Sequence, residues 1–283
     1  MKKLPTGVPW IAPAVGLLLA LSIYPLIYSI KVSFTSEAGG FTAAHYARLF
    51  QDRLFAVACW QTAEYLTVAL VVEFGLGLSL ALLVDSLGRG RGVFRAGLLA
   101  PMLLPPVVAA VIWRLIYNPQ FGVLNGTLRA AGIPAQRLTW TSGESSAMFS
   151  VLLVDIWEWT PFLFLLLSAG LRAFPQEPYE AAKIDGASQW QVFRDITLPL
   201  LKPTIVLALL LRAMDLARIF DQIFILTQGG PGFATETVSL YIYRTAFRFF
   251  NFGYAAAMSF VALALTTIFA RALLRLMRAG SAR

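Results

Sequence analysis

Four polar and aromatic residues share one helical face inside an apolar stretch of the sequence. Asp155, Glu158, Trp159 and Phe162 are spaced at i, i+3, i+4 and i+7, which places them on the same side of a helix. Carboxylate oxygens accept hydrogen bonds from hydroxyl groups, and aromatic rings cover the apolar C–H face of a sugar. This face suits sugar binding, although acids within a helix bundle also pair with buried cations.

A second apolar stretch carries charges at successive steps of three, at Arg212, Asp215, Arg218 and Asp221. Opposite charges three residues apart can pair along a helix, which would keep the helix insertable in a membrane. Arg212 could instead hold an anionic substituent such as a phosphate or sulfonate, because arginine forms bidentate pairs with such groups. One more acid, Glu73, lies in another apolar stretch, near 63–84. We expect it to have a hydrogen-bonded partner in the interior.

The composition requires a membrane protein to position these residues. Of the 283 residues, 58% are hydrophobic and 13% are charged, whereas a soluble domain carries about 25% charged residues. Disorder is excluded too, because a chain with 21 Phe and 7 Trp does not stay solvated. We predict an all-α membrane protein with a single domain over 1–283 and six transmembrane helices of the length that a bilayer requires. The spans lie near 8–30, 63–84, 96–117, 147–170, 203–226 and 254–275.

The basic residues predict the orientation of these spans. The chain has 23 Lys and Arg against 15 Asp and Glu, a formal net charge of +8. With the N-terminus inside, the inner segments hold more basic residues than the outer loops, including Lys2, Lys3, Arg89 and Arg283. This bias predicts that both termini lie in the cytoplasm.

Three further features limit the chemistry of the chain. The single cysteine, Cys59, permits no internal disulfide and no multi-thiolate metal site, and we expect no metal. The single histidine, His45, lies in a connecting stretch and is interpreted as a surface or interface residue. Pro105-Pro106 falls inside the third span, where it should kink the helix.

The loop between the fourth and fifth spans, about 175–199, carries the most informative motif. It reads Glu180-Ala181-Ala182, three residues, Gly186, nine residues, and then Ile196-Thr197-Leu198-Pro199. We predict a short helix after Pro178, a break at Gly186, and a second helix around 190–195 that Pro199 closes. Apolar side chains here, such as Ile184, would be unfavourable on a bare loop. The segment is either a docking element for a cytoplasmic partner or a loop folded on its own bundle.

This motif matches the signature loop of ABC importer permeases at every fixed position. Three more segments resemble the maltose-type carbohydrate permeases, which are binding-protein-dependent inner membrane components. These segments are Asn118-Pro119-Gln120-Phe121-Gly122-Val123-Leu124-Asn125, Leu226-Thr227-Gln228-Gly229-Gly230-Pro231 and Phe252-Gly253-Tyr254-Ala255-Ala256-Ala257. The resemblance covers most of the chain from the second span onward, and it is to the subunit type that pairs with a second, different permease.

The resemblance implies a permease subunit of an ATP-driven carbohydrate importer in the bacterial cytoplasmic membrane, with the type I importer fold. It implies a coupling helix that contacts the ATPase through Glu180, Ala181, Ala182, Asp185 and Gly186. The chain lacks a G-x-x-x-x-G-K-[ST] phosphate loop. The chain would therefore be a transport subunit rather than an enzyme, and two copies of a separate ATP-binding subunit would bind ATP and Mg²⁺. The other implied partners are a second homologous permease in a heterodimer and an extracytoplasmic solute-binding protein, with no nucleic acid.

The resemblance also implies a substrate site near the middle of the membrane. Its positions correspond to Asp155, Glu158, Trp159, Phe162, Arg212 and Asp215, whereas Arg218 and Asp221 are interpreted as structural partners. The maltose-type site has neutral amides where this chain has Asp and Arg, so the substrate stays open among sugars, oligosaccharides, glycosides and polyols. The net negative charge of the six residues favours a neutral substrate over an anionic one. The outer loop, about 31–62, is too short for the extracellular domain inserted in the best-known maltose permease.

Other function classes explain fewer of these features. A proton- or sodium-coupled secondary transporter would explain Glu73 and Asp215, but it predicts inverted repeats that the sequence does not show. A membrane-embedded enzyme lacks clustered His or Cys and a nucleophile–base arrangement within a span. A channel is disfavoured because the charges look paired rather than arranged as a selectivity ring.

Overall fold

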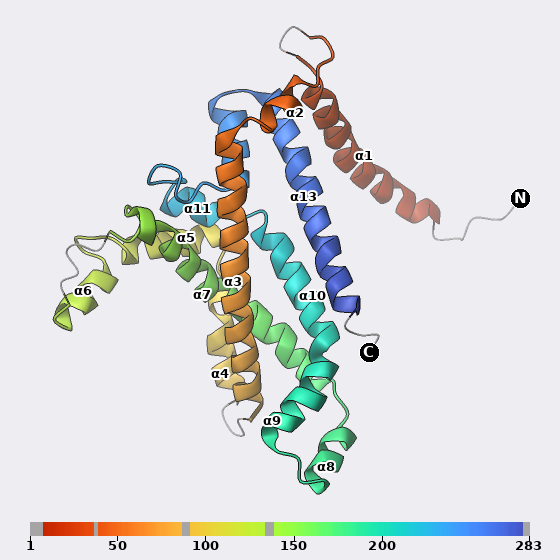
Figure 1. The fold of residues 1–283 in the computed structure, drawn as a ribbon, viewed down its shortest axis with the longest axis vertical. Helices are drawn as coiled ribbons and strands as arrows, with labels where there is room; N and C mark the ends of the chain where they lie inside the picture. Colours follow the sequence, from red (N-terminus) through yellow and green to blue (C-terminus); the bar gives the residue numbers. More distant parts are fainter. Residues whose placement is uncertain (1–7, 37–38, 87–90, 134–138, 280–283) are drawn as a thin grey trace, which may run out of the picture. The chain divides into compact units, whose positions relative to one another are not determined.

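The computed structural model describes residues 8–36, 39–86, 91–133 and 139–279, and Figure 1 shows that they are mainly helical. Within these residues, the only β pairing is an isolated bridge between Thr35 and Phe41. The chain divides into two compact units, one of 1–55 with 241–265 and the other of 56–240 with 266–283. The basic residues Lys2, Lys3, Arg89 and Arg283, used above for orientation, lie outside the described residues.

Five helical runs in the described residues are long and apolar enough to cross a membrane, and they overlap five of the six predicted spans. The runs are Pro13–Ser33, Arg53–Val84, Glu144–Arg172, Gln189–Leu226 and Phe252–Arg275. They belong to α1 (Val8–Ser33), α3 (Arg53–Ser86), α7 (Glu144–Arg172), α10 (Leu198–Leu216) with its flanking helices, and α13 (Phe252–Ala279). The long apolar helices predicted from composition therefore form, although α3 begins ten residues before the predicted second span and α10 ends ten residues before the predicted end of the fifth.

The region predicted as the third span, 96–117, is not one continuous helix. It consists of α4 (Arg91–Leu99), a 3₁₀ turn at Pro101–Leu103 and α5 (Pro106–Ile116), followed by α6 (Val123–Ala130). Leu104 and Pro105 are extended, with ψ of 138° and 139°. Helical geometry is unfavourable for a residue that precedes a proline, and Pro106 can begin a new helix. The kink expected from the sequence is therefore a complete break in the helix.

The region predicted as the fifth span, 203–226, is also divided. The helix α10 ends at Leu216, and a separate short helix, α11, runs from Asp221 to Leu226. Arg218 lies between them and donates from Nε to the Met214 carbonyl oxygen at 3.2 Å. Among the described residues, no ion pair joins Arg218 to Asp221, because the helix ends before it can align them.

The same helix begins earlier than expected. A short helix, α9 (Gln189–Val192), continues through a π-helical turn at Phe193–Thr197 directly into α10. Pro199 was predicted to close the preceding loop, but it lies inside continuous helical backbone, two residues after the π-helical turn ends. The loop and the fifth span are therefore joined by continuous helical backbone.

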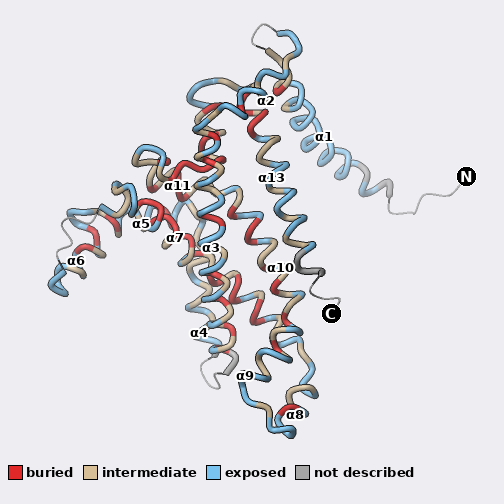
Figure 2. The backbone as a smooth tube through the Cα atoms, in the orientation of Figure 1, coloured by how far each residue is buried: buried red, intermediate tan, exposed pale blue. Residues whose placement is uncertain are grey.

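The core of the larger unit lies where α3, α7 and α10 meet. Its buried cluster contains Ala81, Val84, Phe164, Leu167, Leu201 and Ile205, two from each helix. Figure 2 shows buried residues along both α7 and α10. The helix α11 packs on α5 and on α7. The core thus fixes the three helices that carry most of the predicted site.

The smaller unit contains α1, α2 (Ala44–Leu49) and parts of α12 (Val238–Tyr243) and α13. Asp52 precedes α3, and its Oδ1 accepts hydrogen bonds from the backbone N–H groups of Leu54 and Phe55 at 2.9 and 3.1 Å. Its Oδ2 accepts from the hydroxyls of Tyr241 at 2.7 Å and Tyr254 at 2.5 Å. Burial raises the pKa of Asp52, but these four hydrogen bonds outweigh it and hold the pKa below its usual value.

Two glycines of α3 give a matched test of the α3–α7 packing. A Cβ at buried Gly77 would lie 2.9 Å from Leu163 Cβ, whereas a Cβ at exposed Gly75 would have nothing within 4 Å. We expect Gly77→Ala to destabilise the protein by about 1–3 kcal/mol through overpacking. Gly75→Ala should stabilise it by up to about 1 kcal/mol through helix propensity. Thermal unfolding of the detergent-purified protein measures both, and equal midpoints would contradict the close approach.

Candidate functional site

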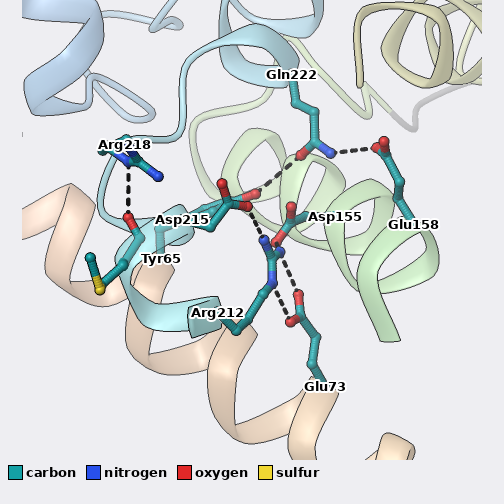
Figure 3. Close-up of polar contacts among 9 residues, drawn as sticks. Tyr65, Glu73, Asp155, Glu158, Arg212, Asp215, Arg218 and Gln222 are labelled. Atoms are coloured by element: carbon teal, nitrogen blue, oxygen red, sulfur yellow. Dashed lines mark hydrogen bonds and ion pairs between the residues drawn. The ribbon is translucent and has the colours of Figure 1, made fainter. Parts of the chain in front are cut away.

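The central feature of the site is one arginine surrounded by three carboxylates (Figure 3). Arg212 of α10 makes a bidentate pair with Glu73 of α3, with Nε–Oε2 at 2.7 Å and Nη2–Oε1 at 2.9 Å. Its Nη2 also donates to Asp155 Oδ2 of α7 at 2.5 Å, and its Nη1 donates to Asp215 Oδ2 at 2.7 Å. The arginine therefore joins three helices that are distant in sequence.

The burial of these groups makes the pairing obligatory. The Arg212 side chain is 1% exposed and those of Glu73 and Asp155 are 0% exposed, whereas Asp215 is 51% exposed. An isolated charge in the interior is strongly unfavourable, so a buried guanidinium must have carboxylate partners. The expectation that Glu73 has an interior hydrogen-bonded partner is confirmed. Its partner is Arg212, which the sequence alone did not identify.

A second group of hydrogen-bonded side chains lies beside the ion pairs of Arg212 (Figure 3). Gln222 of α11 donates from Nε2 to Glu158 Oε2 at 2.8 Å and accepts at Oε1 from the Tyr65 hydroxyl at 3.2 Å. All three residues are buried. Tyr65 and Gln222 were not predicted as site residues. Their sequence signal is weak, because each is one neutral polar residue in an apolar helix.

The aromatic residues complete the site. The Trp159 ring lies 5.0 Å from Arg212 Cζ, in cation–π geometry, and it meets Phe162 edge-on with centroids 6.2 Å apart. Both rings are partly exposed. The structure thus brings the six predicted residues together but divides them by burial. Asp155, Glu158 and Arg212 are buried, while Trp159, Phe162 and Asp215 are accessible.

The predicted coupling loop forms two short helices. The first, α8 (Glu177–Ile184), ends at a turn where Gly186 has φ of +73°, and Ser188 and Gln191 form a capping box that begins α9. A positive φ favours glycine, which explains the residue at this position. The turn is closed by a hydrogen bond of 2.9 Å from the Ala187 N–H to the Ala182 carbonyl oxygen.

Two large apolar side chains of this loop are exposed, alongside charged residues such as Glu180 and Asp185. Ile184 is 86% exposed and Trp190 is 66% exposed, and the Trp190 ring contacts Phe193 with centroids 5.6 Å apart. Of the residues predicted at the ATPase contact, only Ala182 is buried, while Glu180, Ala181, Asp185 and Gly186 are exposed. The loop presents large apolar side chains that the described part of this chain leaves uncovered.

Comparison with known proteins identifies the family. The model for the binding-protein-dependent transport system inner membrane component matches residues 73–279, which include the buried ion pairs and the loop. The chain belongs to this family. It is therefore a multi-pass membrane protein and a transport subunit, as the resemblance in its loop motif implied.

Curated relatives of this inner membrane component carry sugar-transport names. The trehalose/maltose transport system permease protein MalF of Thermococcus litoralis is 39% identical over 253 residues, covering 87% of this chain and 84% of the relative. The sulfoquinovosyl glycerol transport system permease protein SmoG of Agrobacterium fabrum is 33% identical over 277 residues, covering 95% and 89%.

A solved structure shows that the fold is shared. One chain of a bacterial alginate ABC transporter, in complex with an alginate pentasaccharide-bound periplasmic protein, superimposes with a TM-score of 0.86. It is 21% identical and covers 96% of this chain and 94% of its own. The inner membrane component described here therefore has an ABC importer permease fold.

Removal of the arginine tests whether the buried pairs hold this permease together. We expect Arg212→Gln to destabilise the protein by about 3–5 kcal/mol, because three carboxylates lose their partner. Arg218→Gln is the matched control, since the exposed Arg218 donates only to a backbone carbonyl, and surface changes stay within about 0.5 kcal/mol. Thermal unfolding in detergent measures both, and indistinguishable midpoints would argue against a structural role for Arg212.

Proposed function

We propose that this chain is the permease subunit of an ATP-driven carbohydrate importer. It would form the translocation path together with a second, homologous permease, and both termini would lie in the cytoplasm. An extracytoplasmic solute-binding protein would deliver the sugar, and two ATP-binding subunits would bind ATP and Mg²⁺. The sugar-transport names of its relatives and its own exposed carboxylate and aromatic rings support this assignment.

The observation that carries the proposal is the exposed loop formed by α8 and α9. Large apolar residues such as Ile184 and Trp190 are unfavourable in water, whereas a partner's cleft would bury them. The capping box and the Gly186 turn are formed by residues of this chain alone. A preformed apolar tip loses little conformational entropy when it docks, which suits a coupling element.

The backbone supplies a route from this loop to the substrate site. Helical backbone runs without interruption from Gln189 to Leu216, through the π-helical turn. The Tyr179 hydroxyl of α8 donates to Thr197 Oγ1 at 3.3 Å, which joins the first loop helix to this continuous helical segment. A displacement of the loop by the ATPase would therefore move α10 and, with it, Arg212 and Asp215.

Alternating access then follows from a change in how α10 packs. When α10 moves, the ion pairs of Arg212 keep α3 and α7 aligned with it. The Asp215 carboxylate would then move relative to the helices that these ion pairs do not join. The ATPase needs only to change the relative stability of two packings by a few kcal/mol. The sugar would contact Asp215, Trp159 and Phe162, with Asp155, Glu158 and Arg212 behind them.

Uptake into proteoliposomes of the complete transporter tests this function. We expect accumulation of a carbohydrate that requires ATP and the solute-binding protein. Uptake driven by a proton or sodium gradient without ATP would instead support a secondary transporter and contradict the proposal.

Two glycines with the same backbone geometry test the coupling role of the loop. Gly186 and Gly132 have φ of +73° and +81°, and neither would place a Cβ within 4 Å of another atom. Valine at either position costs about 1–2 kcal/mol in the left-handed region. We expect Gly186→Val to lower uptake per ATP hydrolysed by about tenfold, with Gly132→Val unchanged. Equal ratios for both variants would contradict coupling through this loop.

A further inference from the structure

The occupancy of Arg212 determines which ligands the accessible surface can bind. We infer that this site selects hydroxyl-bearing ligands without an anionic group, and that Glu73 sets this preference although it is buried away from the ligand. The inference rests on the proposed function, because it concerns the same carbohydrate site. It addresses the question that the sequence left open, whether Arg212 binds an anionic substituent.

Arg212 has almost no capacity left to bind an anion. Four of its five N–H groups donate to Glu73, Asp155 and Asp215, and only one hydrogen on Nη1 is unused. Anion recognition by arginine depends on two parallel N–H groups facing the ligand. Both bidentate edges that involve Nη2 are occupied by Glu73 and Asp155, and the guanidinium is 1% exposed.

The charge of Arg212 is also cancelled. Three carboxylates surround one guanidinium, so the group carries no net positive charge if even one carboxylate is ionised. The most exposed member is Asp215, which is itself an acid. An anionic ligand reaching this surface would therefore meet a like charge, and such a juxtaposition costs several kcal/mol.

The remaining accessible features fit a neutral sugar. Asp215 uses Oδ2 for Arg212, and its Oδ1 has no partner among the described residues, so it can accept a hydrogen bond from a ligand hydroxyl. The partly exposed rings of Trp159 and Phe162 can cover C–H groups of the same ligand. One free acceptor beside two rings is a site for hydroxyl and C–H groups.

Glu73 enters this account as a positioning residue. Its two oxygens hold Nε and Nη2 of Arg212 at 2.7 and 2.9 Å, which fixes the plane of the guanidinium. Without that carboxylate, two carboxylates rather than three would surround Arg212, and the group would carry one negative charge fewer towards an anionic ligand. We therefore expect the loss of Glu73 to weaken discrimination against anionic ligands, which a merely structural residue would not do.

The test compares matched ligands on the membrane complex. The complex of this chain with its partner permease and ATP-binding subunits is placed in lipid nanodiscs, without solute-binding protein, and binding is measured by equilibrium dialysis. The probes are maltose, trehalose and glucosyl glycerol, each paired with the form in which one C6 hydroxymethyl is oxidised to a carboxylate. We expect at least one neutral sugar to bind, with its carboxylate form about tenfold weaker or worse.

The outcomes separate this inference from the proposed function. A carboxylate form that binds as tightly as its neutral partner, or more tightly, would overturn the inference and leave the carbohydrate function standing. If no probe binds and none supports ATP-driven uptake by the complete transporter, the carbohydrate function is contradicted and the inference falls with it.

Variants of the carboxylates around Arg212 provide a second measurement, the ratio of neutral to anionic affinity. Glu73→Gln should reduce the ratio of neutral to anionic affinity by about tenfold, while Glu64→Gln, which changes an exposed acid on the same helix, should leave it unchanged. Size-exclusion chromatography shows whether each variant assembles. If Glu73→Gln fails to assemble, Asp215→Asn replaces it and should also narrow the ratio, because it removes the exposed negative charge. An unchanged ratio in an assembled variant would overturn the role of these carboxylates.

Discussion

The buried charge of Arg212 is the constraint on which the larger unit depends. A guanidinium that is 1% exposed must be surrounded by carboxylates, and these come from three different helices. The apolar core beside it is built from the same three helices, α3, α7 and α10. Close packing at Gly77 allows α3 and α7 to approach each other, so that Glu73 and Asp155 reach one arginine. The fold and the site are thus two consequences of one arrangement.

The same arrangement relates the site to the loop. Because α9 continues into α10, the residue that gathers the carboxylates lies on the helix that begins at the exposed loop. We propose that this helix transmits displacements of the loop to the charged cluster around Arg212. The break at Ala217–Phe220 separates α10 from α11, which carries Gln222.

The sequence predicted the features that depend on local pattern. Apolar length indicated the spans, and residue spacing placed Asp155, Glu158, Trp159 and Phe162 on one helix, as the structure has them. The two loop helices and the break at Gly186 were also confirmed, because capping and glycine signals are local. The failures have local causes as well. The break after Leu104 and the end of α10 at Leu216 interrupt apolar stretches that composition alone describes as continuous.

Pairing across helices could not be predicted in the same way. Glu73 and Arg212 are 139 residues apart, and only tertiary packing brings them together. Their coupling is therefore the most direct test of the account. A double-mutant cycle compares the unfolding midpoints of Arg212→Gln, Glu73→Gln and the double variant. The account predicts that the double variant is more stable than Arg212→Gln alone, with a coupling of about 1–3 kcal/mol, because it removes an unpaired buried acid. Additive losses would contradict it.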